Sequence, residues 1–77
     1  RVAFTRVEAR LAQALLDLEI DGAVEATHAE LAARIGSARE VVSRRLEALA
    51  RRGFLTTDRG RVALRDRTGL RRLSLAV

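Results

Sequence analysis

The chain has 77 residues, which is enough for one small domain. It contains no cysteine, so a disulfide, a thiolate metal site and a thiol nucleophile are excluded, and no apolar run is long enough to span a bilayer. The lack of cysteine fits a reducing compartment, and we expect a single cytoplasmic domain over residues 1–77. Because the chain begins at Arg1 and holds no methionine, we expect it to be part of a longer protein.

Charge is distributed unevenly along the chain. The net charge is +5, and all fifteen basic residues are arginine. Residues 1–33 hold three arginines and six acidic residues, a net of −3, whereas residues 34–77 hold twelve arginines and four acidic residues, a net of +8. A composition bias explains the arginine count but not this segregation. A basic half of the molecule is typical of a nucleic-acid-binding surface.

Residues 4–19 predict a first helix. Its apolar residues recur at helical spacing and form one stripe, made of Val7, Leu11, Ala14, Leu15 and Leu18. Thr5 and Glu8 have the spacing of a capping box, so we expect Thr5 at the N-cap. The acidic stretch 19–25 contains a glycine and predicts a loop, with a very short strand at residues 24–26.

A second helix is predicted to begin after Thr27, because Glu30 completes another capping box. Its core-facing residues would be Leu31, Ala32 and Ile35. Gly36 would end this helix after about two turns, and Ser37 would start the next helix at once. Two helices joined so closely, with glycine in the turn, are typical of a helix-turn-helix.

Residues 38–52 predict a third helix. Ser37 is a favourable N-cap with Glu40 at capping-box spacing, and Gly53 can adopt the left-handed conformation that closes a helix. One face is apolar and consists of Val42, Leu46, Leu49 and Ala50. The other face carries Arg39, Glu40, Ser43, Arg44 and Glu47. Such a mixture of donors and acceptors suits the edges of DNA bases.

The residue pattern changes after the third helix. Residues 54–57 favour a strand, Asp58-Arg59-Gly60 predicts a tight turn, and residues 61–65 alternate between polar and apolar. Asp66 would cap a last short helix, in which the apolar residues are Leu70, Leu73 and Leu75 and in which Gly69 is unfavourable. The predicted fold is mainly α with a small β-hairpin: a winged helix-turn-helix with a three-helix core plus a wing.

The stretches VEARLAQALLDL, THAELAARIGSAREVVSRRLEALARRGFL and GRVALRD cover nearly the whole chain. They resemble the C-terminal DNA-binding domain of the cyclic-AMP-receptor/fumarate–nitrate-regulator (Crp/Fnr) family. The most specific part is Arg39-Glu40-Val41-Val42-Ser43-Arg44, which is similar to the R-E-x-V-S-R recognition helix of that family. Arg45 departs from the family pattern, which more often has an apolar residue there. We expect the stem of Arg45 to cover the core while its head reaches solvent.

The resemblance implies that four residues contact DNA bases. Glu40 would accept from cytosine N4 and Arg44 would donate to guanine O6 and N7, in agreement with the donor and acceptor pattern of the major groove. Arg39 resembles a base-reading arginine of one family branch and Ser43 a serine of the other, and a half-site containing TGA is implied. Alternatives remain. In these alternatives, Glu40 only completes a capping box and pairs with Arg44 one turn later, Arg44 is solvated, Arg39 contacts phosphate, and Ser43 contacts phosphate or nothing.

Five residues are predicted to contact DNA phosphates: Thr27, His28, Ser37, Arg59 and Arg61. The first two begin a helix, where free amides and the helix dipole favour an anion, and the two arginines lie at the wing tip. The alternatives are plain N-caps at Thr27 and Ser37 and a charged strand edge at the wing. A single histidine without cysteine or clustered carboxylates does not predict a metal site.

These features favour sequence-specific binding of double-stranded DNA by the output domain of a dimeric bacterial transcription regulator. The resemblance implies a homodimer on a pseudo-palindromic site, suggests contact with RNA polymerase near the acidic loop, and places the effector in a separate N-terminal sensor domain. We expect no cofactor, no membrane partner and no enzymatic activity, because no catalytic motif is present. Two alternatives remain: a protein-interaction winged helix, and a DNA-binding winged helix of another regulator family.

Overall fold

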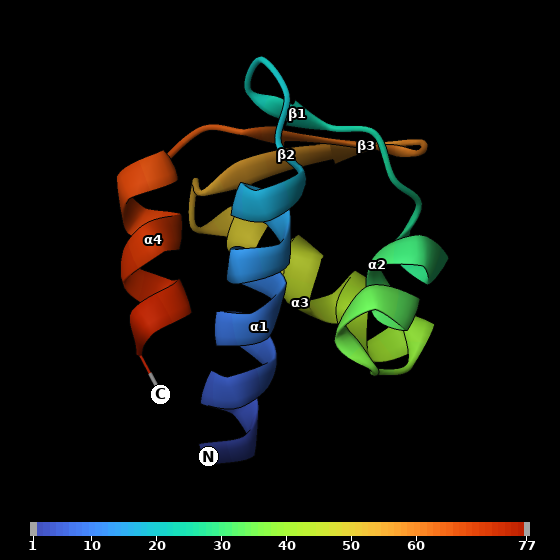
Figure 1. Ribbon diagram of the computed structural model, residues 1–77, viewed down its shortest axis with the longest axis vertical. Coiled ribbons are helices and arrows are strands. Elements are labelled where there is room, and N and C mark those ends of the chain that lie inside the picture. The colour runs from blue at the N-terminus through green and yellow to red at the C-terminus, as the bar shows by residue number, and fades with distance from the viewer. Residues whose placement is uncertain (1, 77) are drawn as a thin grey trace.

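The computed structural model describes the backbone of residues 2–76 and the side chains of residues 6–76. The elements follow in the order α1 (Val2–Leu18), β1 (Ala23–Val24), α2 (His28–Ile35), α3 (Arg39–Arg51), β2 (Leu55–Asp58), β3 (Arg61–Leu64) and α4 (Arg67–Leu75). The sheet crosses one end of the molecule, and the helices lie below it (Figure 1). This is the expected mainly α, winged helix-turn-helix fold. In the part of the chain just given, no helix combines the length and apolar character that a membrane span requires.

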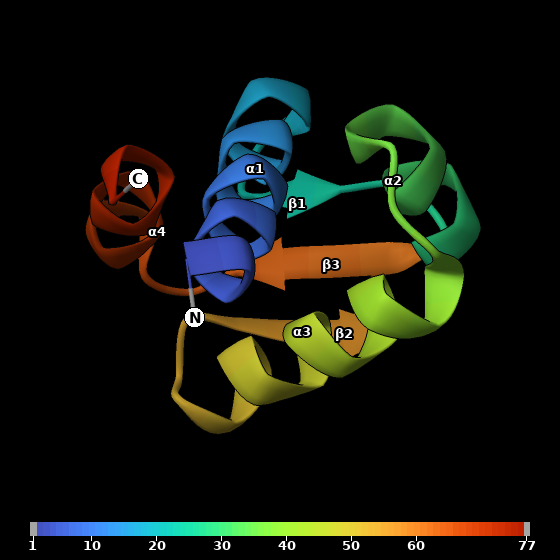
Figure 2. The same cartoon turned by 90° about the horizontal axis from the view of Figure 1, so that it is seen from below.

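Helix α1 is the central element of the core. Its apolar stripe places Leu11 and Leu15 entirely out of contact with solvent, and α4 lies alongside it in both views (Figures 1 and 2). The capping box predicted at Thr5 is wrong, because the helix begins at Val2 and Thr5 lies inside it. No proline or glycine stands in residues 2–5, so nothing there stops the helix before Thr5.

Helix α2 begins and ends as expected. Oγ1 of Thr27 accepts from the Glu30 N–H at 3.1 Å, and the Glu30 carboxylate accepts from the Thr27 N–H at 2.8 Å, which completes the capping box. Gly36 ends the helix with φ +71°, a left-handed conformation in which a side chain is strained. Leu31, Ala32 and Ile35 are buried as predicted.

The capping box predicted for Ser37 and Glu40 is wrong. The Ser37 N–H donates to the Ala32 carbonyl at 2.9 Å, so this residue still belongs to the end of α2. The N-cap of α3 is Ala38, which offers no side-chain cap. The C-terminal end of α3 matches the prediction. Gly53 has φ +86°, and the N–H of Phe54, the next residue, donates back to the carbonyl of Leu49 in the last turn of the helix.

The wing forms as predicted and gains a third strand. β2 and β3 pair from Leu55↔Leu64 to Asp58↔Arg61, which leaves a two-residue loop between them. β1 pairs with the other side of β3, so the antiparallel order is β1-β3-β2. The short strand was predicted one to two residues too late. A pair of hydrogen bonds between the backbones of Ile20 and Ala23 closes a turn there, so the strand begins at residue 23.

The last helix, α4, is capped as predicted by Asp66, whose carboxylate accepts from the Gly69 N–H at 2.8 Å. Leu70 is fully buried, but Leu75 is 75% exposed, so its assignment to the apolar face is wrong. The structure explains why glycine stands at position 69, inside a helix. A Cβ at that position would collide with the ring of Phe54 and with the Asp66 carboxylate.

Candidate nucleic-acid interface

The outward face of α3 presents the residues that were predicted to contact bases. Arg39, Glu40 and Arg44 are exposed and Ser43 is half-buried. On the opposite side of the helix, Val42, Leu46 and Leu49 are completely buried. The apolar contacts therefore fix the rotation of the helix, and this rotation turns the polar face toward solvent.

Glu40 has neither of the structural roles that competed with base contact. Glu40 does not complete a capping box, because the N-cap is Ala38, which makes no side-chain cap hydrogen bond, and Glu40 is the second residue of the helix and not the third. Among the residues that the structure describes, no ion pair joins Glu40 to Arg44. Both side chains stand one turn apart on the surface, free to meet a ligand that offers a donor to one and an acceptor to the other.

The arginines divide into paired and unpaired groups. Arg45 and Arg52 lie 3.4 and 3.9 Å from the Glu8 carboxylate, Arg61 lies 3.0 Å from Glu25, and Arg67 pairs with Glu19. Within residues 6–76, ten arginines have no ion-pair partner, and Arg39, Arg44 and Arg59 are among them. The cations at the start of α3 and at the wing turn are thus available for an anionic ligand.

A hollow of about 400 Å³ lies where the starts of α2 and α3 meet the wing turn. Its lining residues are Thr27, His28, Ala29, Arg39, Thr57, Asp58, Arg59 and Gly60. Three of the five predicted phosphate-contacting residues, Thr27, His28 and Arg59, therefore share one concave surface with Arg39. Ser37 and Arg61 do not line it.

The start of α2 can supply backbone donors to this hollow. The capping box uses the N–H of Glu30, whereas His28 and Ala29 are the first two helical residues and have no acceptor inside the helix. The wing turn approaches closely, since a Cβ on Gly60 would lie 4.0 Å from Cγ2 of Thr27. This hollow therefore combines the start of a helix, with its free amides and positive dipole end, with two arginines and one carboxylate, Asp58, which accepts from the Arg59 N–H.

His28 and Ser43 were predicted to make separate contacts, one with phosphate and one with a base, but their side chains are hydrogen-bonded to each other. Nδ1 of the histidine lies 2.7 Å from Oγ of the serine, and both side chains are partly buried. The contact joins the first residue of α2 to the second turn of α3. No local pattern could reveal it, because it depends on how the two helices cross.

Two other long-range contacts were also missed. The Arg61 guanidinium, predicted at the wing tip, donates to Glu25 beside β1. Arg45 was expected to reach solvent, but its side chain is only 20% exposed and its head group contacts Glu8 of α1, which is 18% exposed. The Glu25 pair is more than half exposed and therefore weak, whereas the Glu8 pair ties α1 to α3.

Comparison with known proteins shows the family to which the chain belongs. The model of the Crp-like helix-turn-helix domain matches residues 9–73. The transcriptional regulator SdrP of Thermus thermophilus is 41% identical, over 96% of this chain and 41% of its own length. The chain thus spans less than half of this relative.

Two solved structures from Thermus thermophilus have the same architecture. A Crp/Fnr-family transcriptional regulator has 38% sequence identity and a TM-score of 0.85, over 96% of this chain and 43% of its own. The catabolite activator protein has 35% identity and a TM-score of 0.88, over 96% of this chain and 36% of its own. The chain therefore belongs to the Crp-like helix-turn-helix domain family, the DNA-binding domains of Crp/Fnr-type transcription regulators.

Proposed function

We propose that this domain reads double-stranded DNA by placing α3 in the major groove, as the output domain of a dimeric bacterial regulator in the cytoplasm. One observation carries the proposal. Arg39, Glu40 and Arg44 stand exposed on the outer face of α3 without an ion-pair partner in residues 6–76, although an arginine and a glutamate one turn apart could pair with each other. These side chains offer bidentate donors and an acceptor to base edges.

Each side chain on this face has a definite role in the proposal. Arg44 donates to guanine O6 and N7, and Glu40 accepts from cytosine N4. Arg39 and Ser43 contact neighbouring bases. Together with the family resemblance, the Glu40 and Arg44 contacts predict a half-site that contains TGA.

The hollow beside α3 holds the DNA backbone. The free amides of His28 and Ala29 donate to a phosphate, with Thr27 and Arg59 on either side of it. Ser37 and Arg61 contact the backbone outside the hollow, and Arg61 must first leave Glu25. These contacts give affinity and fix the register, whereas α3 reads the sequence. A symmetric dimer would read two half-sites about one helical turn apart.

The test is selection from randomised duplex DNA by the whole chain joined to a neutral dimerising protein. Arg44→Ala should relax one base pair at a cost of about 1–3 kcal/mol. Arg51→Ala is the matched control, because Arg51 is an exposed arginine in the last turn of the same helix. Enrichment of inverted repeats that Arg44→Ala loses and Arg51→Ala keeps would support the proposal. Uniform, salt-sensitive binding without enrichment would refute it.

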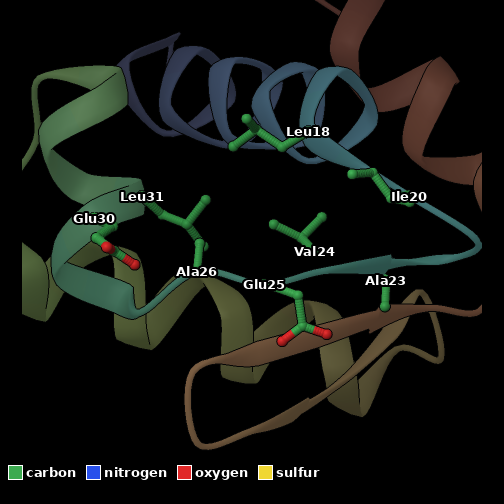
Figure 3. Close-up of a pocket in the computed structure, with 8 residues that line it drawn as sticks. All are labelled: Leu18, Ile20, Ala23, Val24, Glu25, Ala26, Glu30 and Leu31. Atoms are coloured by element: carbon green, nitrogen blue, oxygen red, sulfur yellow. The ribbon is translucent and has the colours of Figure 1, made fainter.

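A second candidate function is supported by an apolar hollow of about 290 Å³ on another part of the surface. Leu18 of α1, Val24 of β1 and Leu31 of α2 line it together with Ile20, which is 76% exposed, and with Glu25 and Glu30 (Figure 3). An exposed apolar side chain next to a hollow suits a protein partner. RNA polymerase is the partner that the family resemblance suggests.

If RNA polymerase binds at this apolar hollow, a substitution there should change polymerase binding without changing DNA binding. Ile20→Asp should abolish binding of RNA polymerase in a pull-down assay and leave DNA selection unchanged, because Ile20 lies outside α3 and outside the hollow at the wing. Loss of DNA selection in this variant, or retention of the polymerase, would contradict the assignment.

A further inference from the structure

We propose that His28 is a positioning residue that decides whether Ser43 offers a DNA base a hydrogen-bond donor or an acceptor. The inference rests on the proposed function above, because it assumes that Ser43 faces a base in the major groove. It begins with one contact, the 2.7 Å hydrogen bond between Nδ1 of His28 and Oγ of Ser43.

This hydrogen bond sets the direction of the serine hydroxyl. A serine inside a helix commonly donates to the carbonyl one turn before it, but here the hydroxyl is bonded to the imidazole of another helix. In the part of the chain that the structure describes, neither side chain makes a second hydrogen bond. The partly buried imidazole therefore controls which atoms of Ser43 remain for DNA.

The chemistry of the imidazole gives two states. When Nδ1 carries no proton, it accepts from the Ser43 hydroxyl, and only the oxygen lone pairs of Ser43 remain to face a base. When Nδ1 carries a proton, it donates to Oγ, and the Ser43 hydroxyl proton is free to be donated to a base. The proton on one ring nitrogen thus reverses the hydrogen-bonding role of a residue in the next helix.

The hollow at the wing selects between these states. His28 lines the space proposed for a phosphate, and donation from Nε2–H to that phosphate leaves Nδ1 of a neutral ring without a proton. Neutral His28 then makes Ser43 an acceptor, and protonated His28 makes it a donor. The groups facing this space are Arg39 of α3 with Asp58 and Arg59 of the wing turn.

A further charged group stands two residues along the chain from His28. On the same helix, the Glu30 carboxylate is held by the Thr27 N–H. A second proton on the imidazole, which acidification favours for a histidine side chain, moves Ser43 from acceptor to donor.

The two states favour different bases. An acceptor at Ser43 suits the amino groups of cytosine N4 or adenine N6, and a donor suits guanine O6 and N7 or thymine O4. The base preference at one position of the site should therefore change with pH, while positions read by Arg44 keep theirs because arginine stays charged.

The experiment measures binding of the chain, joined to the same dimerising protein, to duplexes that differ at single base pairs, by fluorescence anisotropy at about pH 8 and about pH 5.5. Ser43→Ala identifies the base pair that Ser43 reads. At that pair, the wild-type preference for the amino-bearing base should fall about three- to tenfold on acidification. His28→Gln hydrogen-bonds without titrating, and its preference should not change with pH. Ratios between duplexes cancel the general effect of an added charge on affinity.

The possible outcomes separate this inference from the proposed function. A pH-independent preference in the wild type, an equal pH effect in His28→Gln, or no altered preference in Ser43→Ala overturns the inference while selection by Arg44 stands. Loss of all sequence selection overturns both. A second test is the ¹⁵N NMR spectrum of His28 bound to the selected duplex at about pH 8. A proton on Nε2 supports the inference, and a neutral ring with its proton on Nδ1 overturns it.

Discussion

Thr27→Ala should destabilise the domain, whereas Ser37→Ala should leave its stability almost unchanged. Both residues occupy the first position of a capping-box pattern, with glutamate three residues later. Only Thr27 acts as a cap: its hydroxyl accepts from Glu30 at 3.1 Å, and the Glu30 carboxylate returns a bond at 2.8 Å. The backbone of Ser37 is engaged in ending α2.

The difference can be given a magnitude. Removal of an N-cap side chain typically costs about 1 kcal/mol, and in a domain of this size 1 kcal/mol corresponds to a shift in Tm of about 4–8 °C. Ser37→Ala removes no cap and keeps the backbone N–H, so its effect should stay within about 0.5 kcal/mol. Thr27→Ser keeps the hydroxyl and should recover most of the loss.

Urea unfolding followed by far-ultraviolet circular dichroism would measure these free energies. Equal losses for Thr27→Ala and Ser37→Ala would refute the reasoning, because they would mean that Ser37 caps α3 in solution. Glu40 would then have a structural role and would not be free to contact a base. The stability of two variants thus tests a premise of the proposed DNA contact without any DNA.

Three further predictions follow from packing and charge. Gly69→Ala should lower stability by about 1 kcal/mol, because crowding of its neighbours costs more than helix propensity returns; calorimetry showing a higher Tm would contradict this. Glu8→Gln should cost about 1 kcal/mol in urea unfolding, since Arg45 loses a half-buried carboxylate, with DNA selection unchanged. Glu25→Gln should free Arg61 and tighten binding to all DNA sequences, whereas Arg61→Ala should lower the salt slope by about one; an unchanged slope in Arg61→Ala would place Arg61 away from the backbone.

Features set by neighbouring residues could be predicted from the sequence. The Thr27–Glu30 capping box, the buried stripe of α3 and the two-residue wing turn each depend on residues a few positions apart, and each is present. Ser37 shows the limit of this reasoning. The sequence pattern at Ser37 is as favourable for an N-cap as the pattern at Thr27. However, the Ser37 N–H is bonded to the end of α2, because Gly36 turns the chain at that point.

Contacts between distant residues could not be predicted. The bond between His28 and Ser43 spans 15 positions, and that between Glu8 and Arg45 spans 37. Both depend on the crossing of helices, which a single sequence does not specify. The candidate site is affected in the same way. Its residues could be named one by one, but the hollow that gathers Thr27, His28, Arg39 and Arg59 appears only in the folded chain.

The charge pattern of the sequence takes on a different meaning in the fold. The basic half, with a net charge of +8, suggested one uncompensated surface, yet four of its twelve arginines pair with Glu8, Glu19 and Glu25 of the acidic half. None of these four arginines lines the wing hollow. Arg45 and Arg52 contact Glu8 of α1, Arg61 contacts Glu25 beside β1, and Arg67 contacts Glu19 just after α1. The field that a DNA backbone would meet therefore comes from unpaired arginines such as Arg39, Arg44 and Arg59, and Arg61 adds to it only after leaving Glu25. Because each neutralised phosphate contributes about 0.9 to the salt slope, DNA binding should show a slope far below what twelve arginines would give.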